Sequence, residues 1–148
     1  MTNAATISGL SSAPAFSVYQ NTAQGSLVSA TDTKVIFDTK EFDTANNFNV
    51  STSTFTPTIA GYYQLNSCVR VDGAQTRIIL SLFKNGGLFR HGNDISNAAG
   101  INNVGSFLVY ANGTTDYFNI YIYASGSSPA LSSGGTNIWF SGCLARGA

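Results

Sequence analysis

Charged side chains are scarce in this chain. Only 9% of its 148 residues are Asp, Glu, Lys or Arg, against about 25% in an average soluble domain. Seven basic and seven acidic residues cancel to a net charge of zero, and Lys and Arg form no run. A protein that binds nucleic acid needs a basic stripe to neutralise phosphates. The composition therefore argues against nucleic acid as a partner.

Long apolar stretches are missing as well. No segment approaches the roughly 18 apolar residues that a membrane-spanning helix needs, so we expect no membrane insertion. Residues 1–12 lack the charged and apolar regions of a signal peptide. They are small and polar, which indicates a linker or attachment tail ahead of a single domain at residues 13–148.

Cysteine and histidine are too few for several kinds of chemistry. Two cysteines, Cys68 and Cys143, do not make a disulfide scaffold and fit no zinc motif, so they are first interpreted as small buried hydrophobes. The single histidine, His91, has Asp94 close in sequence, but no nucleophile motif accompanies them. We therefore expect a protein that is not an enzyme.

The carboxylates are spread thinly, with a loose group at Asp32, Asp38, Glu41 and Asp43. A pair such as Glu41 and Asp43 keeps a carbohydrate-acting enzyme as a remote alternative. Calcium is a better use of loop carboxylates, but the dense acidic loop of a calcium site is absent. We expect no cofactor, and calcium remains an open alternative.

What the chain does have is short β-type runs separated by Gly, Asn, Ser and Thr. Hydrophobic residues make up 43% of it, enough for one core, and no segment keeps a helical period. Asn85-Gly86-Gly87 and Asn112-Gly113 are hairpin signals. This spacing predicts an all-β antiparallel sandwich or jelly roll, with strands at 15–19, 34–38, 62–71, 77–84, 87–90, 104–110, 117–124 and 138–144.

Residues 117–123 alternate strictly. Phe118, Ile120 and Ile122 form a core face. The opposite face is rich in tyrosine, and comprises Tyr117, Asn119, Tyr121 and Tyr123. Tyrosine supplies a large contact area and a hydroxyl, which suits a subunit interface. A cross-strand aromatic ladder on a wetted sheet is the alternative.

Five short motifs occur in the order found in one known family. They are Pro14-Ala15-Phe16-Ser17; Val35-Ile36-Phe37 with Phe42-Asp43; Phe55-Thr56-Pro57 with Gly61-Tyr62-Tyr63 and Leu65; Asn112-Gly113 with Asp116, Phe118 and Ile120; and Phe140-Ser141-Gly142 with Leu144. Over residues 13–146 the chain resembles the globular head of the C1q family, within the C1q/TNF-like superfamily. That resemblance implies a ten-stranded antiparallel jelly-roll β-sandwich that forms trimers.

The resemblance also implies where the trimer contact lies. It places residues 62–71 and 138–144 on neighbouring strands whose outer face lines the trimer axis. Alternation puts both cysteines on that face, which we expect to adjoin the tyrosines of 117–123. The expected interface is Tyr62, Cys68, Tyr117, Asn119, Tyr121, Tyr123, Trp139 and Cys143. The cysteines are then a disulfide or, in a reducing cytoplasm, a free buried pair.

The chain departs from animal members of the family in having no collagen stalk and little charge. In these respects it is similar to C1q-like domains of bacterial surface proteins and phage tail or fibre proteins. We expect a homotrimeric binding or structural domain of a virion or cell surface, contacting a protein or glycan receptor or a neighbouring structural protein. A purely structural decoration or adaptor protein is the alternative. Ligand contacts are expected on loops at 91–103 and 125–136, with candidates His91, Asn93, Asp94, Ser127, Ser128 and Asn137.

Overall fold

The computed structural model describes residues 13–131 and 134–148, and these residues form strands and turns with no α-helix. Eleven strands occur in chain order. They are β1 (Ala15–Tyr19), β2 (Gly25–Ser26), β3 (Thr31–Lys34), β4 (Thr39–Asp43), β5 (Phe48–Asn49), β6 (Thr54–Phe55), β7 (Gly61–Lys84), β8 (Gly87–Ala111), β9 (Phe118–Gly126), β10 (Ala130–Leu131) and β11 (Ile138–Gly147).

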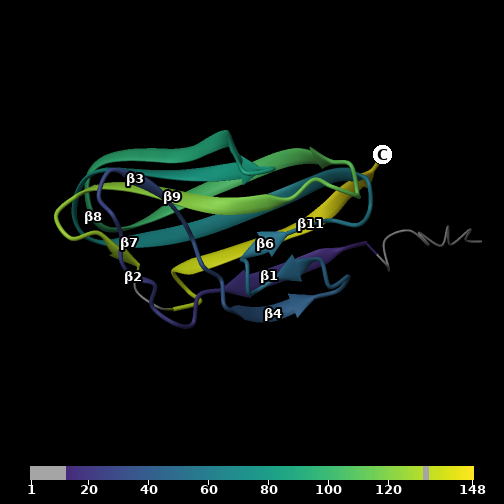
Figure 1. The fold of residues 1–148 in the computed structure, drawn as a ribbon, viewed down its shortest axis with the longest axis horizontal. Coiled ribbons are helices and arrows are strands. Elements are labelled where there is room, and N and C mark those ends of the chain that lie inside the picture. Colours follow the sequence, from purple (N-terminus) through teal and green to yellow (C-terminus); the bar gives the residue numbers. More distant parts are fainter. Residues whose placement is uncertain (1–12, 132–133) are drawn as a thin grey trace, which may run out of the picture.

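Two long strands connect the two layers of the sandwich. The first half of β7 pairs with β11, and its second half pairs with β9. β8 follows β7 antiparallel along its length, with irregular register near Val71 and Ala74. Layer A therefore contains β4, β1, β11, residues 61–71 of β7 and residues 101–111 of β8. Layer B contains β3, β9, residues 75–84 of β7 and residues 87–99 of β8. In Figure 1, β9 runs above β11, β1 and β4.

The core lies between the layers and is filled by aromatic and β-branched side chains. Phe16 stacks on Phe55 with ring centroids 4.3 Å apart and meets the edge of Phe140 at 5.0 Å. All three rings are at most 1% exposed, and the core face of β9 is fully buried. At about 1.5–3 kcal/mol for each large side chain removed from water, this cluster is a main source of stability.

The predicted all-β antiparallel architecture is confirmed, while the expected count of ten strands is not. The hairpin at Asn85-Gly86 is present. Its two turn residues have φ of 54° and 80°, the positive values that such a turn needs and that Asn and Gly tolerate. Val35 and Phe37 are buried, but of the strand expected at 34–38 only Lys34 lies in a strand, β3. The predicted loop at 91–103 is wrong, because these residues belong to β8. The predicted tail, residues 1–12, lies outside the described residues.

Candidate assembly surface

The eight predicted interface residues do not share one surface. Tyr62 and Cys68 lie on β7, and Trp139 and Cys143 on β11, in layer A. Asn119, Tyr121 and Tyr123 lie on β9, which pairs with the other half of β7 and with β3, and Tyr117 directly precedes that strand. The expectation that the β9 tyrosines adjoin Cys68 and Trp139 is therefore wrong. The physical reason is that β7 passes from one layer to the other, so the outer faces of its two halves point away from each other.

The outer face of layer A carries an exposed apolar strip that the sequence analysis missed. Tyr62 is 44% exposed, Leu108 59% and Tyr110 44%. The rings of Tyr62 and Tyr110 face each other across β7 and β8 with centroids 5.5 Å apart. With residues 145–148 these three side chains line a groove of about 700 Å³. Val104 extends the strip along β8 and is 46% exposed.

The strip borders a free sheet edge. Within the described residues β8 pairs only with β7, so its other side offers backbone N–H and C=O groups. Edge strands are usually protected by proline or by charged residues, especially lysine. Residues 101–111 contain none of these. An unprotected edge beside exposed apolar side chains is a surface suited to covering by another chain.

The two cysteines do lie on the predicted outer face of layer A, but they are far apart along it. Trp139 is opposite Cys68 across the β11–β7 ladder, whereas Cys143 is opposite Gln64. Both thiols are free. Cys68 is 4% exposed, and burial raises the pKa of its thiol, which lowers the fraction present as the reactive thiolate.

The tyrosine-rich face of β9 packs partly on the chain itself. Tyr121 stacks on Phe83 of β7 with ring centroids 3.9 Å apart, as in the aromatic-ladder alternative. Asn119 is only 4% exposed. Its Nδ2 donates to the carbonyl of Ser53 at 2.8 Å and to Thr54 Oγ1 at 3.0 Å. Asn119 thus holds residues 53–54 against β9 through its amide nitrogen.

The predicted ligand residues fall on different elements. His91, Asn93 and Asp94 are exposed positions of strand β8. Asp94 accepts bonds from Arg77 Nε and Nη2, at 2.9 and 2.6 Å. Because of this bond to Arg77, the pKa of Asp94 is lowered. The remaining three candidates are turn residues: Ser127 and Ser128, both exposed, and Asn137, which is half-buried.

His91 contacts a serine of the neighbouring strand. Its Nδ1 lies 2.9 Å from Ser81 Oγ, across the register irregularity between β7 and β8. A serine nucleophile must reach a substrate carbonyl. Ser81 is 0% exposed, so this hydroxyl is enclosed and the pair ties two strands together.

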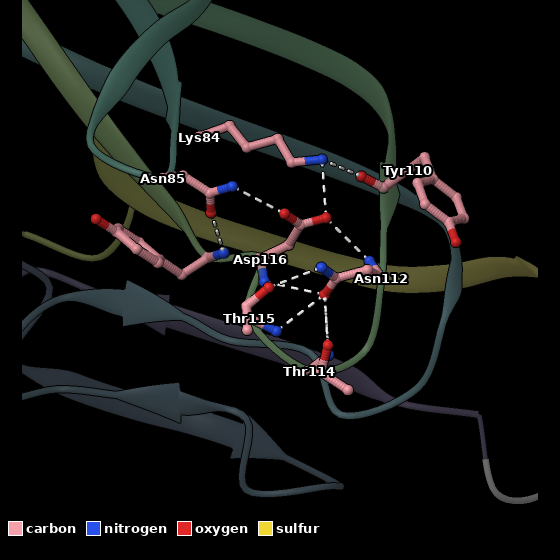
Figure 2. Close-up of polar contacts among 8 residues, drawn as sticks. Lys84, Asn85, Tyr110, Asn112, Thr114, Thr115 and Asp116 are labelled. Carbon is pink, nitrogen blue, oxygen red and sulfur yellow. Dashed lines mark hydrogen bonds and ion pairs between the residues drawn. The ribbon is translucent and has the colours of Figure 1, made fainter.

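Two turns at one end of the sandwich are joined through the carboxylate of Asp116 (Figure 2). Asp116 Oδ1 accepts from Asn85 Nδ2 at 2.8 Å. Asp116 Oδ2 accepts from the N–H of Asn112 and from Lys84 Nζ, both at 2.9 Å. Lys84 Nζ also donates to the carbonyl of Tyr110 at 2.9 Å. The cluster fixes the β7–β8 turn to the β8–β9 loop at one end of the apolar strip.

These contacts set the protonation of Asp116. Burial alone raises its pKa, but hydrogen bonds from Asn85, Lys84 and the N–H of Asn112, with the charge of Lys84, outweigh that effect. The pKa is therefore lowered, and the carboxylate stays charged. Each such bond to a charged group contributes about 1.5–3 kcal/mol. The cluster is a structural clamp whose charges are paired.

Among the described residues, no three His, Cys, Asp or Glu side chains lie close enough together to hold a metal ion. In the same residues, no helix is long and apolar enough to cross a membrane.

The sequence matches no model of a known protein family and no curated protein. The fold, however, matches solved structures. Murine APRIL superposes with a TM-score of 0.70 at 11% identity, covering 89% of this chain and 98% of that one. The globular domain of zebrafish complement 1qA gives 0.60 at 19% identity, covering 91% and 99%. PRD1 vertex protein P5 gives 0.62 at 15% identity, covering 90% and 97%. The chain has a C1q/TNF-like jelly-roll fold, as its sequence motifs predicted.

Proposed function

We propose that this chain forms a homotrimer through the outer face of layer A and serves as an assembly and attachment domain of a virion or cell surface. The observation that carries the proposal is the exposed strip of Tyr62, Leu108 and Tyr110 beside the free edge of β8. Contiguous exposed apolar patches on soluble proteins usually mark interaction sites. Trp139 and Cys143 extend the same face across β11.

The neighbours in fold support the class of function. Resemblance to the C1q/TNF-like superfamily implies threefold assembly, and threefold symmetry multiplies weak single contacts with a receptor. One structural neighbour is named as a vertex protein, which favours a virion location. The genes flanking the coding sequence separate a virion component from a cell-surface protein.

The trimer is tested by sedimentation of the purified chain at micromolar concentration. We expect a species of three times the 15.5 kDa chain mass. Leu108→Glu should convert it to monomers, because three carboxylates would enter an apolar contact and each would lose its hydration. A monomeric wild-type chain overturns the proposal.

Leu88→Glu is the matched control. Leu88 lies on the same strand and is 52% exposed, close to the 59% of Leu108, but it belongs to layer B. The Leu88 variant should remain trimeric. If Leu88→Glu dissociates the trimer and Leu108→Glu does not, the contact lies on layer B and the proposed face is wrong.

A further inference from the structure

A second concave surface lies away from the layer A strip, where the turn after β4 meets the segment after β6. The N–H of Thr56 donates to the carbonyl of Asn47 at 2.8 Å and joins the two segments. The hollow has a volume of about 510 Å³, within the usual range for small-molecule sites. Its lining is mostly uncharged and polar: Lys40, Asn46, Asn47, Phe48, Asn49, Val50, Thr56 and Thr58.

The asparagines of the hollow are oriented by their amide oxygens. Asn46 Oδ1 accepts from Lys40 Nζ at 3.1 Å, and Asn49 Oδ1 accepts from the N–H of Ser51 at 2.9 Å. Within the described residues, neither Asn46 nor Asn49 donates its amide NH2 group to a protein atom. An asparagine with an engaged oxygen presents an NH2 group that can only donate. Both side chains therefore offer fixed donors at an exposed rim.

Asn47 carries a buried donor without a partner. The residue is 5% exposed, and its Oδ1 accepts from Thr58 Oγ1 at 3.2 Å. Its Nδ2 is enclosed and makes no hydrogen bond to any residue that the structure describes. Buried polar groups in folded proteins nearly always have a partner. Asn47 lines the hollow, so a ligand atom could accept from this donor once the enclosed amide turns toward the hollow.

The hollow is close to electrical neutrality. Lys40 Nζ is paired with Asp43 Oδ2 at 2.9 Å. The same carboxylate accepts from the N–H groups of Asn47 and Phe48, at 3.0 and 2.9 Å. With its cation balanced, the site has no excess charge to attract an anion. The half-buried Val50 adds an apolar contact beside the amide donors.

From this arrangement we infer that the hollow binds a pyranose sugar and prefers one that bears an acetamido group. A neutral, hydroxyl-rich ring matches the uncharged donors and threonine hydroxyls, and the acetamido carbonyl is a strong acceptor for a preset NH2 group. The site names a receptor class for the attachment role, and in that sense it rests on the proposed function. It shares no lining residue with the layer A groove.

The test follows the side-chain NH2 signals of the 15N-labelled chain by NMR during titration with two probes. These are methyl N-acetyl-β-D-glucosaminide and methyl β-D-glucoside, at millimolar concentration. We expect the first to shift the signals of Asn46, Asn47 and Asn49 and to bind more tightly than the second. The inference is overturned if neither probe shifts these signals. It is also overturned if the two probes bind equally well and shift the signals of another surface.

Variants at the exposed rim avoid disturbing the buried Asn47. Asn46 has a φ of 54°, so Asn46→Gly removes the donor and keeps the backbone conformation. Combined with Asn49→Ala it should weaken binding of the acetamido probe about 10-fold or more, from the loss of two hydrogen bonds. Asn93→Ala, on exposed β8, is the control and should bind like the wild type. Unchanged binding in the double variant overturns the inference.

The trimer proposal and the sugar-site proposal can each be disproved independently of the other. The NMR titration reports on each protomer, and sedimentation of the same samples reports on assembly. If the chain is a trimer and its asparagine signals shift with neither probe, the sugar site is disproved and the assembly proposal stands. If the chain is a monomer that binds the acetamido probe through these asparagines, the trimer proposal is disproved and the sugar site stands.

Discussion

Trp139 lies directly opposite Cys68 in the β11–β7 ladder. Cys143 is four residues further along β11 and faces Gln64. At roughly 3.3 Å per residue, Cys68 and Cys143 are offset by about 13 Å along the strands alone, whereas disulfide-bonded Cα atoms are usually within about 7 Å. An intrachain disulfide cannot form without moving the strands.

We therefore predict that mild oxidation leaves the chain without an internal crosslink. Intact mass under non-reducing conditions should show no loss of two hydrogens within one chain. Gln64→Cys combined with Cys68→Ser is the positive control, since it places a cysteine directly across from Cys143. An internal crosslink in the wild type, at the yield of the control, would show that the register is different.

Neutralising Asp116 should destabilise the fold. Asp116→Asn removes the ion pair with Lys84. The two carboxylate oxygens, which accept from Asn85 and from the N–H of Asn112, are replaced by one neutral amide oxygen and one NH2 group. The oxygen is a weaker acceptor, and the NH2 group cannot accept at all. We expect a loss of about 1–3 kcal/mol in the free energy of unfolding, measured by denaturant titration. Asp94→Asn removes a solvent-exposed pair with Arg77 and should have a much smaller effect. Equal effects of the two changes would contradict the clamp.

Stability should fall in acid. The pKa values of Asp38, Asp43 and Asp116 are lowered in the fold, because hydrogen bonds from neighbouring groups outweigh the effect of burial. A lowered folded-state pKa gives stability that is present above the unfolded value, about 3.9, and is lost as the pH drops through the folded value. Thermal unfolding should show a flat Tm from pH 7 to about 5 and a decline below about 4. A Tm that rises on acidification below pH 4 would refute this.

Gly113 should tolerate no side chain. Its φ is +73°, and a Cβ would lie within 2.4 Å of the backbone nitrogen of Ala60. Gly25 has a similar φ of +75° with open space around it, so it isolates the backbone effect. Gly113→Ala should cost about 1–3 kcal/mol more than Gly25→Ala in denaturant unfolding. Similar losses for both variants would mean that the β8–β9 loop can move away from Ala60.

Alternation along single strands was predictable, and the layer to which a strand belongs was not. The core face of Phe118, Ile120 and Ile122 follows from a period of two and is fully buried. The same pattern cannot show which half of β7 the strand will join. The pairing of Tyr121 with Ser81, not with the half of β7 that carries Cys68, depends on contacts between distant segments.

Residues 91–103 show a second limit. Their Gly, Asn and Ser content is typical of loops, but pairing with β7 keeps them in β8, because tertiary pairing overrides weak local preference. Gly100, with a φ of 61°, lies in this long strand. The candidate sugar site was equally hidden, since Asn47 and Thr58 meet only after the chain has folded.

The passage of β7 and β8 through both layers has a consequence for how the molecule opens. We expect neither layer to unfold while the other stays folded, because β7 and β8 each contribute one half to each layer. Amide hydrogens of both layers should then exchange through one near-global event, apart from the short edge strands. We expect a domain built this way to resist mechanical pulling as one unit and to unfold in a single step.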